Sequence, residues 1–542
     1  MRELRYTLLF LFGFMGCLLA QRSDALPPSL GGKLTIGIVA DPTELLHPLR
    51  VRALEEKRIA DLIFGNSVFR KSEATRNPPN FFNIEPSDRS NRLWKIVLRR
   101  GIAFHDGNYM SNEDIVFTIE LIRKFGGALL NVPLRFDDVV QMKKNGDLEL
   151  LVELKDGDKL FVERIAQIPI LPSHYYSDAL EKGFAVFRNK APMGSGPYRW
   201  SSSTKDQLRL VFHPNYYAGR PFLQEISVRF YDNEQQISSA LVNDQIDFAE
   251  LPDHGSANRL HDLMKSKLNV FLVPREATRI TFILFNLKSF PLSAKEARRA
   301  LHLALNRIDM ASGVGPLLNT VMPVEHSDYD RSLFSNDYNP QAAIQMLRDK
   351  GWTQLPGSNL MAKEGKPFSF ELFFAEKSTL EENLARTILL NLRELNIDVK
   401  PIPLPSVSKK KRLEQGTFES MIFSYEYDSE YIYEALEEFY FEILGAGATP
   451  VNYRNRYISN IFRIAREGGE RESIPQRFQL FVHQEMPAVF LFHEQARVVA
   501  VRNRVKGFRT QEITQAGTIT RLNPIEEWFI PRELQRGSSN GN

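Results

Sequence analysis

Apolar and polar residues follow two different periods along this chain, and segments of the two kinds alternate. Short runs that are continuously apolar, or nearly so, predict strands over 33–39, 226–230 and 280–286. Residues 297–307, ARRALHLALNR, repeat instead at helical spacing, so that one face carries Ala300, Leu301, Ala304 and Leu305. Strands that alternate with helices in this way predict an α/β fold.

The most informative local pattern is residues 98–120, LRRGIAFHDGNYMSNEDIVFTIE. Asp106-Gly107 is a dipeptide suited to a tight hairpin turn. Ser111 and Asp114 resemble a capping box that opens a helix. The helix that follows is expected to bury one stripe of side chains, formed by Ile115, Val116, Ile119 and Ile122.

The adjacent His105 and Asp106 suggest catalysis or metal binding at first sight. No further His, Cys or carboxylate follows at the spacing of a metal-ligand set, so we interpret the pair as structural. The 10 histidines of the chain are scattered, without the paired spacing typical of zinc sites. The sequence therefore predicts no metal, no cofactor and no catalytic residue.

Length and charge narrow the classes of function. The chain has 542 residues, more than the ~250–300 at which one hydrophobic core usually stops growing, so two lobes are expected. Its formal charge of +3 gives no reason to propose a nucleic-acid partner. The basic run 409–412, KKKR, is interpreted as the solvated side of a helix.

The amino terminus has the features of an export signal. Arg2 and Arg5 precede an apolar run over 8–20, which is shorter than the ~20 residues that span a bilayer. We expect residues 1–25 to be a signal peptide. Cys17, the only cysteine, leaves two alternatives open: a lipobox-like site that becomes lipidated, or ordinary cleavage with Cys17 in the signal core.

Several motifs recur in the order known from one protein family. After the hydrophobic-Arg pair, the Phe-His-Asp-Gly turn and the capped helix come 191–198, APMGSGPY, then 243–248, NDQIDF, then the helix 297–307 and finally 505–508, VKGF. This chain resembles the family 5 extracellular solute-binding proteins, the oligopeptide, dipeptide and nickel receptors of ABC importers. It departs from the family pattern at His47, where Asp is usual, and over 70–92, which lacks a Leu-Ala-x-x-Trp element.

The resemblance implies a particular domain organisation. We expect a two-lobed periplasmic-binding-protein fold of type II, similar to cluster C, with an extra sub-domain in the first lobe. The predicted first lobe covers 32–280 with an inserted sub-domain at about 66–190, the second lobe covers 281–504, and residues 505–535 return to the first lobe.

The resemblance also implies where a ligand would bind. In peptide-binding members an aspartate of an Asp-Tyr-x-Asp-Pro segment anchors the ligand's amino group, and Glu426 matches that aspartate. Tyr425, Tyr427 and Asp428 are expected beside it. Acidic residues and tyrosines alternate here, however, as they also do on a half-exposed strand without any ligand.

Ser195 lies in the glycine-flanked turn of APMGSGPY, which can approach a ligand or form a structural corner. Its glycines are immediate neighbours, so the turn is not a G-x-S-x-G nucleophile elbow.

The predicted function is an exported receptor that captures peptides or a related small solute and delivers them to the permease subunits of an ABC transporter. We expect a monomer in the periplasm, or a lipoprotein that faces the periplasm. Contact with the membrane is expected only through the lipid anchor. One alternative is an exported hydrolase, but H-E-x-x-H and P-loop motifs are absent from the sequence. Another is a divergent receptor for nickel, haem or a sugar.

Overall fold

A computed structural model shows how these segments fold. It describes residues 28–40, 46–49, 54–65, 81–129, 136–158, 161–166, 168–183, 186–187, 190–251, 267–312, 314–324, 326–333, 338–376, 378–427, 432–445, 455–466, 471, 473–514 and 518–535. The predicted signal peptide, Cys17 and Asp428 lie outside these residues.

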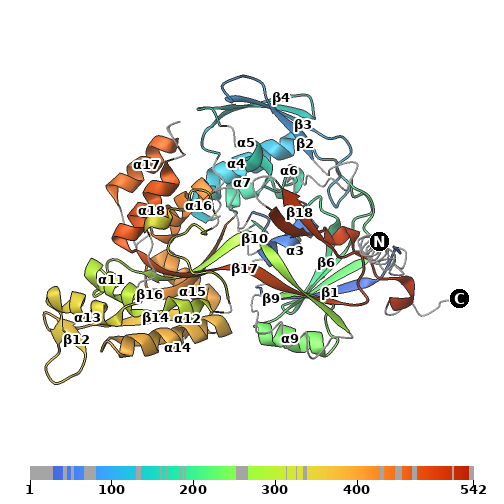
Figure 1. Ribbon diagram of the computed structural model, residues 1–542. Helices are drawn as coiled ribbons and strands as arrows, with labels where there is room; N and C mark the ends of the chain where they lie inside the picture. Colours follow the sequence, from blue (N-terminus) through green and yellow to red (C-terminus); the bar gives the residue numbers. More distant parts are fainter. Residues whose placement is uncertain are drawn as a thin grey trace, which may run out of the picture.

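A mixed ten-stranded sheet runs through the whole molecule, in the order β15-β14-β16-β10-β17-β9-β1-β8-β7-β6 (Figure 1). Its strands are β1 (Lys33–Ile38), β6 (Tyr198–Ser203), β7 (Gln207–Phe212), β8 (Glu225–Phe230), β9 (Phe248–Leu251), β10 (Leu268–Phe285), β14 (Ser369–Ala375), β15 (Asp398–Leu404), β16 (Ser420–Tyr427) and β17 (Ala488–Arg502). The two long strands, β10 and β17, cross from one half of the sheet to the other.

Three smaller sheets accompany the large one. A four-stranded sheet, β2-β3-β5-β4, stands above the rest of the molecule in Figure 1, and two hairpin-like sheets are β11-β12-β13 and β18-β19. Their bounds are β2 (Phe82–Pro86), β3 (Leu93–Leu98), β4 (Val139–Asn145), β5 (Glu149–Leu154), β11 (Thr353–Gln354), β12 (Met361–Lys363), β13 (Lys366–Pro367), β18 (Thr510–Thr514) and β19 (Thr518–Leu522).

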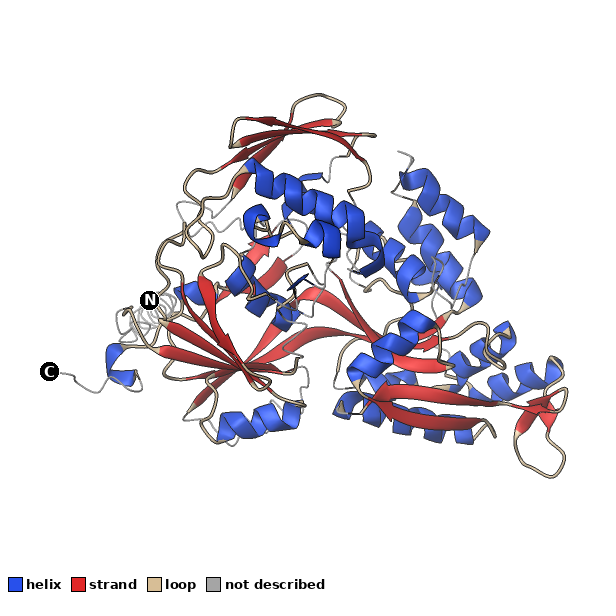
Figure 2. Cartoon of the chain, turned by 180° about the vertical axis from the view of Figure 1, so that it is seen from behind, coloured by secondary structure: helices blue, strands red, loops and turns tan. Residues whose placement is uncertain are grey.

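Helices cover both faces of the large sheet (Figure 2). They are α3 (Leu54–Phe64), α4 (Asn112–Leu129), α5 (Phe161–Ala166), α6 (Ser173–Tyr176), α7 (Ala179–Lys182), α9 (Glu234–Val242), α11 (Lys295–Ala304), α12 (Arg307–Ala311), α13 (Pro340–Asp349), α14 (Thr379–Arg393), α15 (Ser406–Gln415), α16 (Ile432–Glu438), α17 (Arg456–Arg466) and α18 (Ile474–Glu485). Within the described part of the chain, none of the helices combines the length and the apolar composition that crossing a bilayer requires.

The buried apolar residues divide between the two halves of the sheet. One core joins residues of 34–248 with residues of 499–530, and a small core beside α9 also uses β10 and β17. Two further cores lie on opposite faces of β10 and β16 and draw only on residues of 280–492. Along β10 and β17, the strand residues pass from the cores of one half of the sheet to the cores of the other half. This occurs close to the lobe boundaries predicted near 280 and 505. The boundaries themselves stay predictions.

The capped helix forms as the sequence predicts. The Ser111 amide donates to Asp114 Oδ2 at 2.8 Å, which is the reciprocal half of a capping box. Ile115, Ile119 and Ile122 are buried and Val116 is half-buried. Asp114 also accepts bonds from Ser173, and thereby ties the start of α4 to α6.

Two local expectations were wrong. The helix predicted over 297–307 ends at Ala304, because Leu305 is extended and Asn306 caps a new helix, α12. Lys409 is not solvated: it is buried, and its Nζ donates to Glu381 at 2.6 Å and to the Ile422 carbonyl at 2.9 Å. One residue of the basic run is therefore part of the buried interior. Lys409 connects α15 with α14 and β16.

The glycine-flanked turn around Ser195 is a packed corner. Added Cβ atoms would lie 2.3 Å from the Ile63 carbonyl oxygen at Gly194 and 2.4 Å from the Leu62 carbonyl oxygen at Gly196. The Gly196 amide donates to Ile63 at 3.0 Å, so the turn lies directly on the end of α3. Both positions require glycine because the backbone of α3 leaves no room for a Cβ atom.

We predict that Gly196→Ala lowers the free energy of unfolding by about 2 kcal/mol or more, because the new methyl group forces α3 and the turn apart. Chemical denaturation monitored by circular dichroism measures the change. Ser202→Ala, at an exposed position of β6, is the control and should stay within about 0.5 kcal/mol. Equal stabilities of the two variants would contradict the packed corner.

Candidate functional site

Three charged side chains form a row across the strands that join the two halves of the sheet. Arg279 of β10 is directly opposite Glu426 of β16 on one side and Glu494 of β17 on the other. Its Nε lies 3.2 Å from Glu494 Oε1, whereas its Nη1 lies 4.0 Å from Glu426 Oε2. One guanidinium is thus shared between two carboxylates.

Exposure differs sharply along this row. The Glu494 side chain is 1% exposed, Glu426 is 16% exposed and Arg279 is 27% exposed. A buried carboxylate needs a counter-ion, because the loss of hydration is costly. Glu494 therefore depends on Arg279 more than Glu426 does.

Tyr425 and Tyr427 lie on the opposite face of β16, in the core beneath α16 and α18. Their rings stack at 5.5 Å between centroids. The Tyr425 hydroxyl donates to Glu438 Oε2 at 2.8 Å, and the Tyr427 hydroxyl donates to the Val321 carbonyl at 2.6 Å. Burial raises the pKa of both hydroxyls. Both tyrosines hold β16 in place, and ligand contact by either stays a prediction.

A second charged group lies nearby, on β9, β17 and α3. Glu250 is 2.9 Å from Arg58 Nε and 2.9 Å from Arg497 Nε, and the Arg497 side chain is fully buried. Arg497 shares a strand face with Val499, a residue of the first core, whereas Glu494 shares the other face with Phe492. The two clusters of charged side chains therefore lie on opposite faces of the strands that join the two halves of the sheet.

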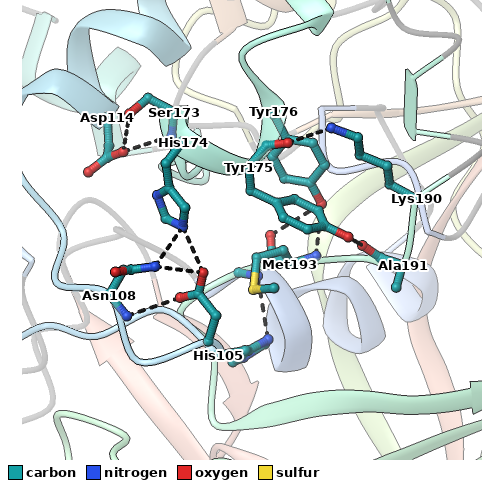
Figure 3. A network of polar contacts seen from close by, with 12 residues as sticks. His105, Asn108, Asp114, Ser173, His174, Tyr175, Tyr176, Lys190, Ala191 and Met193 are labelled. Atoms are coloured by element: carbon teal, nitrogen blue, oxygen red, sulfur yellow. Dashed lines mark hydrogen bonds and ion pairs between the residues drawn. The ribbon is translucent and has the colours of Figure 1, made fainter.

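Figure 3 shows a network of polar contacts that includes His105, Asn108 and His174. The His174 ring is 2.7 Å from Asp106 Oδ2, and Asn108 also donates to this carboxylate. Burial alone would raise the pKa of Asp106, but the hydrogen bonds from His174 and Asn108 hold it below its usual value. The structure thus brings together a histidine and an aspartate that are distant in sequence.

His105 belongs to the corner around Ser195 and not to a ligand set. The ring nitrogens His105 Nε2 and His213 Nδ1 each lie 3.2 Å from the Gly196 carbonyl oxygen, so each donates a proton to it. Ser195 is fully buried beside Phe64. Among the described residues, no group of three or more His, Cys, Asp or Glu side chains is arranged to hold a metal ion. Ligand contact by Ser195 stays a prediction.

Sequence reasoning named Glu426 as a candidate but did not name Arg279 or Glu494, the other two members of the row. Arg279 comes immediately before the apolar run of 280–285, and Glu494 interrupts the apolar run of β17. Charges in buried strands require partners, so both were signals. What the sequence could not supply was the register that places them opposite each other.

Comparisons with known proteins identify the family. The model of bacterial extracellular solute-binding proteins, family 5 (middle part), matches residues 86–442. The oligopeptide-binding protein AppA of Bacillus subtilis (strain 168) is 23% identical over 537 residues, which are 95% of this chain and 94% of that protein. This chain therefore belongs to the family 5 extracellular solute-binding proteins.

Solved structures agree in fold. AppA from Bacillus subtilis in complex with a nonapeptide has a TM-score of 0.76 at 20% identity, covering 93% of this chain and 100% of that one. NikZ from Campylobacter jejuni in complex with Ni(L-His) has a TM-score of 0.75 at 17% identity, with 93% and 100% covered. The predicted α/β fold of the type II periplasmic binding proteins is confirmed.

The buried ring of His105 predicts a loss of stability in acid. Burial, followed by the neighbouring His213, lowers the pKa of His105 from 6.5 to about 3. As the pH falls below 6.5, protons bind the unfolded chain before the folded one, so stability decreases between pH 6.5 and 3. At pH 5 the loss should be about 1–2 kcal/mol, since part of the residue's surface is exposed.

Thermal unfolding at pH 7 and pH 5 measures this loss. His105→Gln keeps a side-chain N–H but cannot take up the proton, so it should reduce the dependence on pH, to which His302 with its similarly lowered pKa also contributes. His174→Gln, at a side chain that is 40% exposed, is the matched control and should change the slope less. An unchanged slope in His105→Gln would show that His105 does not carry the effect.

Proposed function

We propose that this protein is an exported receptor that binds peptides through their main chain and delivers them to the permease subunits of an ABC transporter. The observation that carries the proposal is Glu426, a largely buried carboxylate at the strands that join the two halves of the sheet. The ammonium group of a peptide is a suitable partner for such a carboxylate.

The arrangement of the row supports an ammonium site. Arg279 lies closer to Glu494 than to Glu426, so the charge of Glu426 is only partly compensated within the row. Glu426 keeps 16% of its side chain exposed, which leaves it accessible to a solute. A second positive charge close to Glu426 would be stabilised more than in water, because the surroundings are poorly hydrated.

The names of similar proteins point to the same ligand class. The full-length relative from Bacillus subtilis is an oligopeptide-binding protein, and its solved structure holds a nonapeptide. The similar fold of NikZ holds Ni(L-His), which makes a nickel complex the second candidate ligand. A haem, a sugar and the activity of an exported hydrolase are the further alternatives.

The remaining features of the proposal follow from the sequence. Residues 1–25 act as the signal peptide, and the mature protein works in the periplasm as a non-catalytic monomer. Lipidation of Cys17 would tether it to the membrane. The solute binds between a first lobe of 32–280 with its insertion at about 66–190 and a second lobe of 281–504, with Tyr425, Tyr427, Asp428 and Ser195 as further candidate contacts.

Native mass spectrometry of the purified protein tests the ligand class. A population of bound short peptides supports the proposal. Bound nickel, haem or sugar, or the appearance of peptide fragments with time, would favour one of the alternatives instead.

We predict that Glu426→Gln weakens binding of trialanine about 30-fold in isothermal titration, equivalent to about 2 kcal/mol, because it leaves the peptide ammonium without its carboxylate. N-acetyl-trialanine, which lacks the ammonium, should bind wild type and variant equally. Glu382→Gln, which removes an exposed carboxylate of α14, is the control and should leave both affinities unchanged. Equal trialanine affinities for wild type and Glu426→Gln would remove Glu426 from the site.

A further inference from the structure

The two carboxylates beside Arg279 are not equivalent. All three side chains come from directly paired positions on β16, β10 and β17, so they lie on one face of the sheet, with Arg279 in the middle. The separation is 3.2 Å toward Glu494 and 4.0 Å toward Glu426. The guanidinium is thus held towards one end of the row.

Burial explains why the guanidinium is held at that end. The Glu494 side chain is 1% exposed, so water cannot take the place of the guanidinium beside it. Glu426 is 16% exposed and can be solvated in part by water. The free-energy cost of leaving a carboxylate without a counter-ion is therefore larger at Glu494.

Arg279 also carries the same charge as the proposed ligand group. If the guanidinium formed a close ion pair with Glu426, it would compensate the negative charge with which the peptide ammonium is proposed to pair. Because Arg279 is 27% exposed and its side chain is long, both positions lie within its reach. The affinity of Glu426 for a ligand ammonium consequently depends on whether the guanidinium lies beside Glu494 or beside Glu426.

We propose that Glu494 is a positioning residue, which holds Arg279 away from Glu426 and thereby keeps the ammonium site open. Arg279 is then a resident competitor of the ligand's amino group, and the buried carboxylate of Glu494 sets how strongly it competes. This inference rests on the proposed function, since it assumes that Glu426 meets a ligand ammonium.

The experiment measures amine preference, defined as the dissociation constant of N-acetyl-trialanine divided by that of trialanine. Glu494→Gln keeps the shape of the side chain but removes its charge, so Arg279 turns to Glu426. We expect the amine preference to fall about tenfold relative to wild type. A merely structural role for Glu494 would weaken both peptides alike and leave the ratio unchanged.

The double variant Arg279→Gln, Glu494→Gln provides the decisive comparison. It removes the competitor together with the carboxylate that holds it, so the net charge of the row is kept. We expect the amine preference to return to the wild-type value or above it. Because the row stays balanced, this variant also tests the inference if Glu494→Gln alone does not fold.

The outcomes separate the inference from the proposed function. An unchanged preference in Glu494→Gln, or a double variant that has lost its preference as Glu426→Gln does, would overturn the role of Glu494 while wild type still prefers the free amine. Absence of any amine preference in wild type would instead overturn the ammonium site, and the inference with it.

Discussion

The antiparallel pairing of β10 with β17 is the contact on which the rest of the structure depends. These two strands belong to both halves of the large sheet, and the buried cores change over along them. Their register shifts between Pro274 and Arg279 and again between Thr281 and Phe282. Such irregularities bend and twist a strand pair. The two halves of the sheet can therefore face different directions while β10 and β17 stay paired on both sides of each irregularity.

The same pairing positions the charges of the candidate site. Arg279 follows directly after the first irregularity, and Glu494 is opposite it on β17. Arg497 and Glu250 are on the adjoining part of β17 and β9. Strand pairing thus brings together charged side chains from distant parts of the chain, and these charges compensate one another.

The sequence predicted those features that depend on near neighbours. The capping box of Ser111 and Asp114 spans three residues, so its geometry is contained in one helical turn. The α/β class follows from periodicity, and the family from motifs in order. The end of α11 at Ala304 was missed, because Asn306 both caps α12 and bonds to Asn391 of another helix. Lys409 was misjudged for the same reason, since its partner Glu381 lies in α14.

Long-range pairing also explains what was missed at the candidate site. Glu426 could be named as a candidate because its segment resembles a family motif, but nothing local connects it with Arg279 or Glu494. A charged residue in an apolar strand indicates only that some partner exists. Burial then determines which partner matters most: Glu494, the least exposed of the three, cannot exchange its counter-ion for water, whereas Glu426 can. The unequal burial of two carboxylates around one guanidinium therefore makes Glu426, and not Glu494, the candidate for ligand contact.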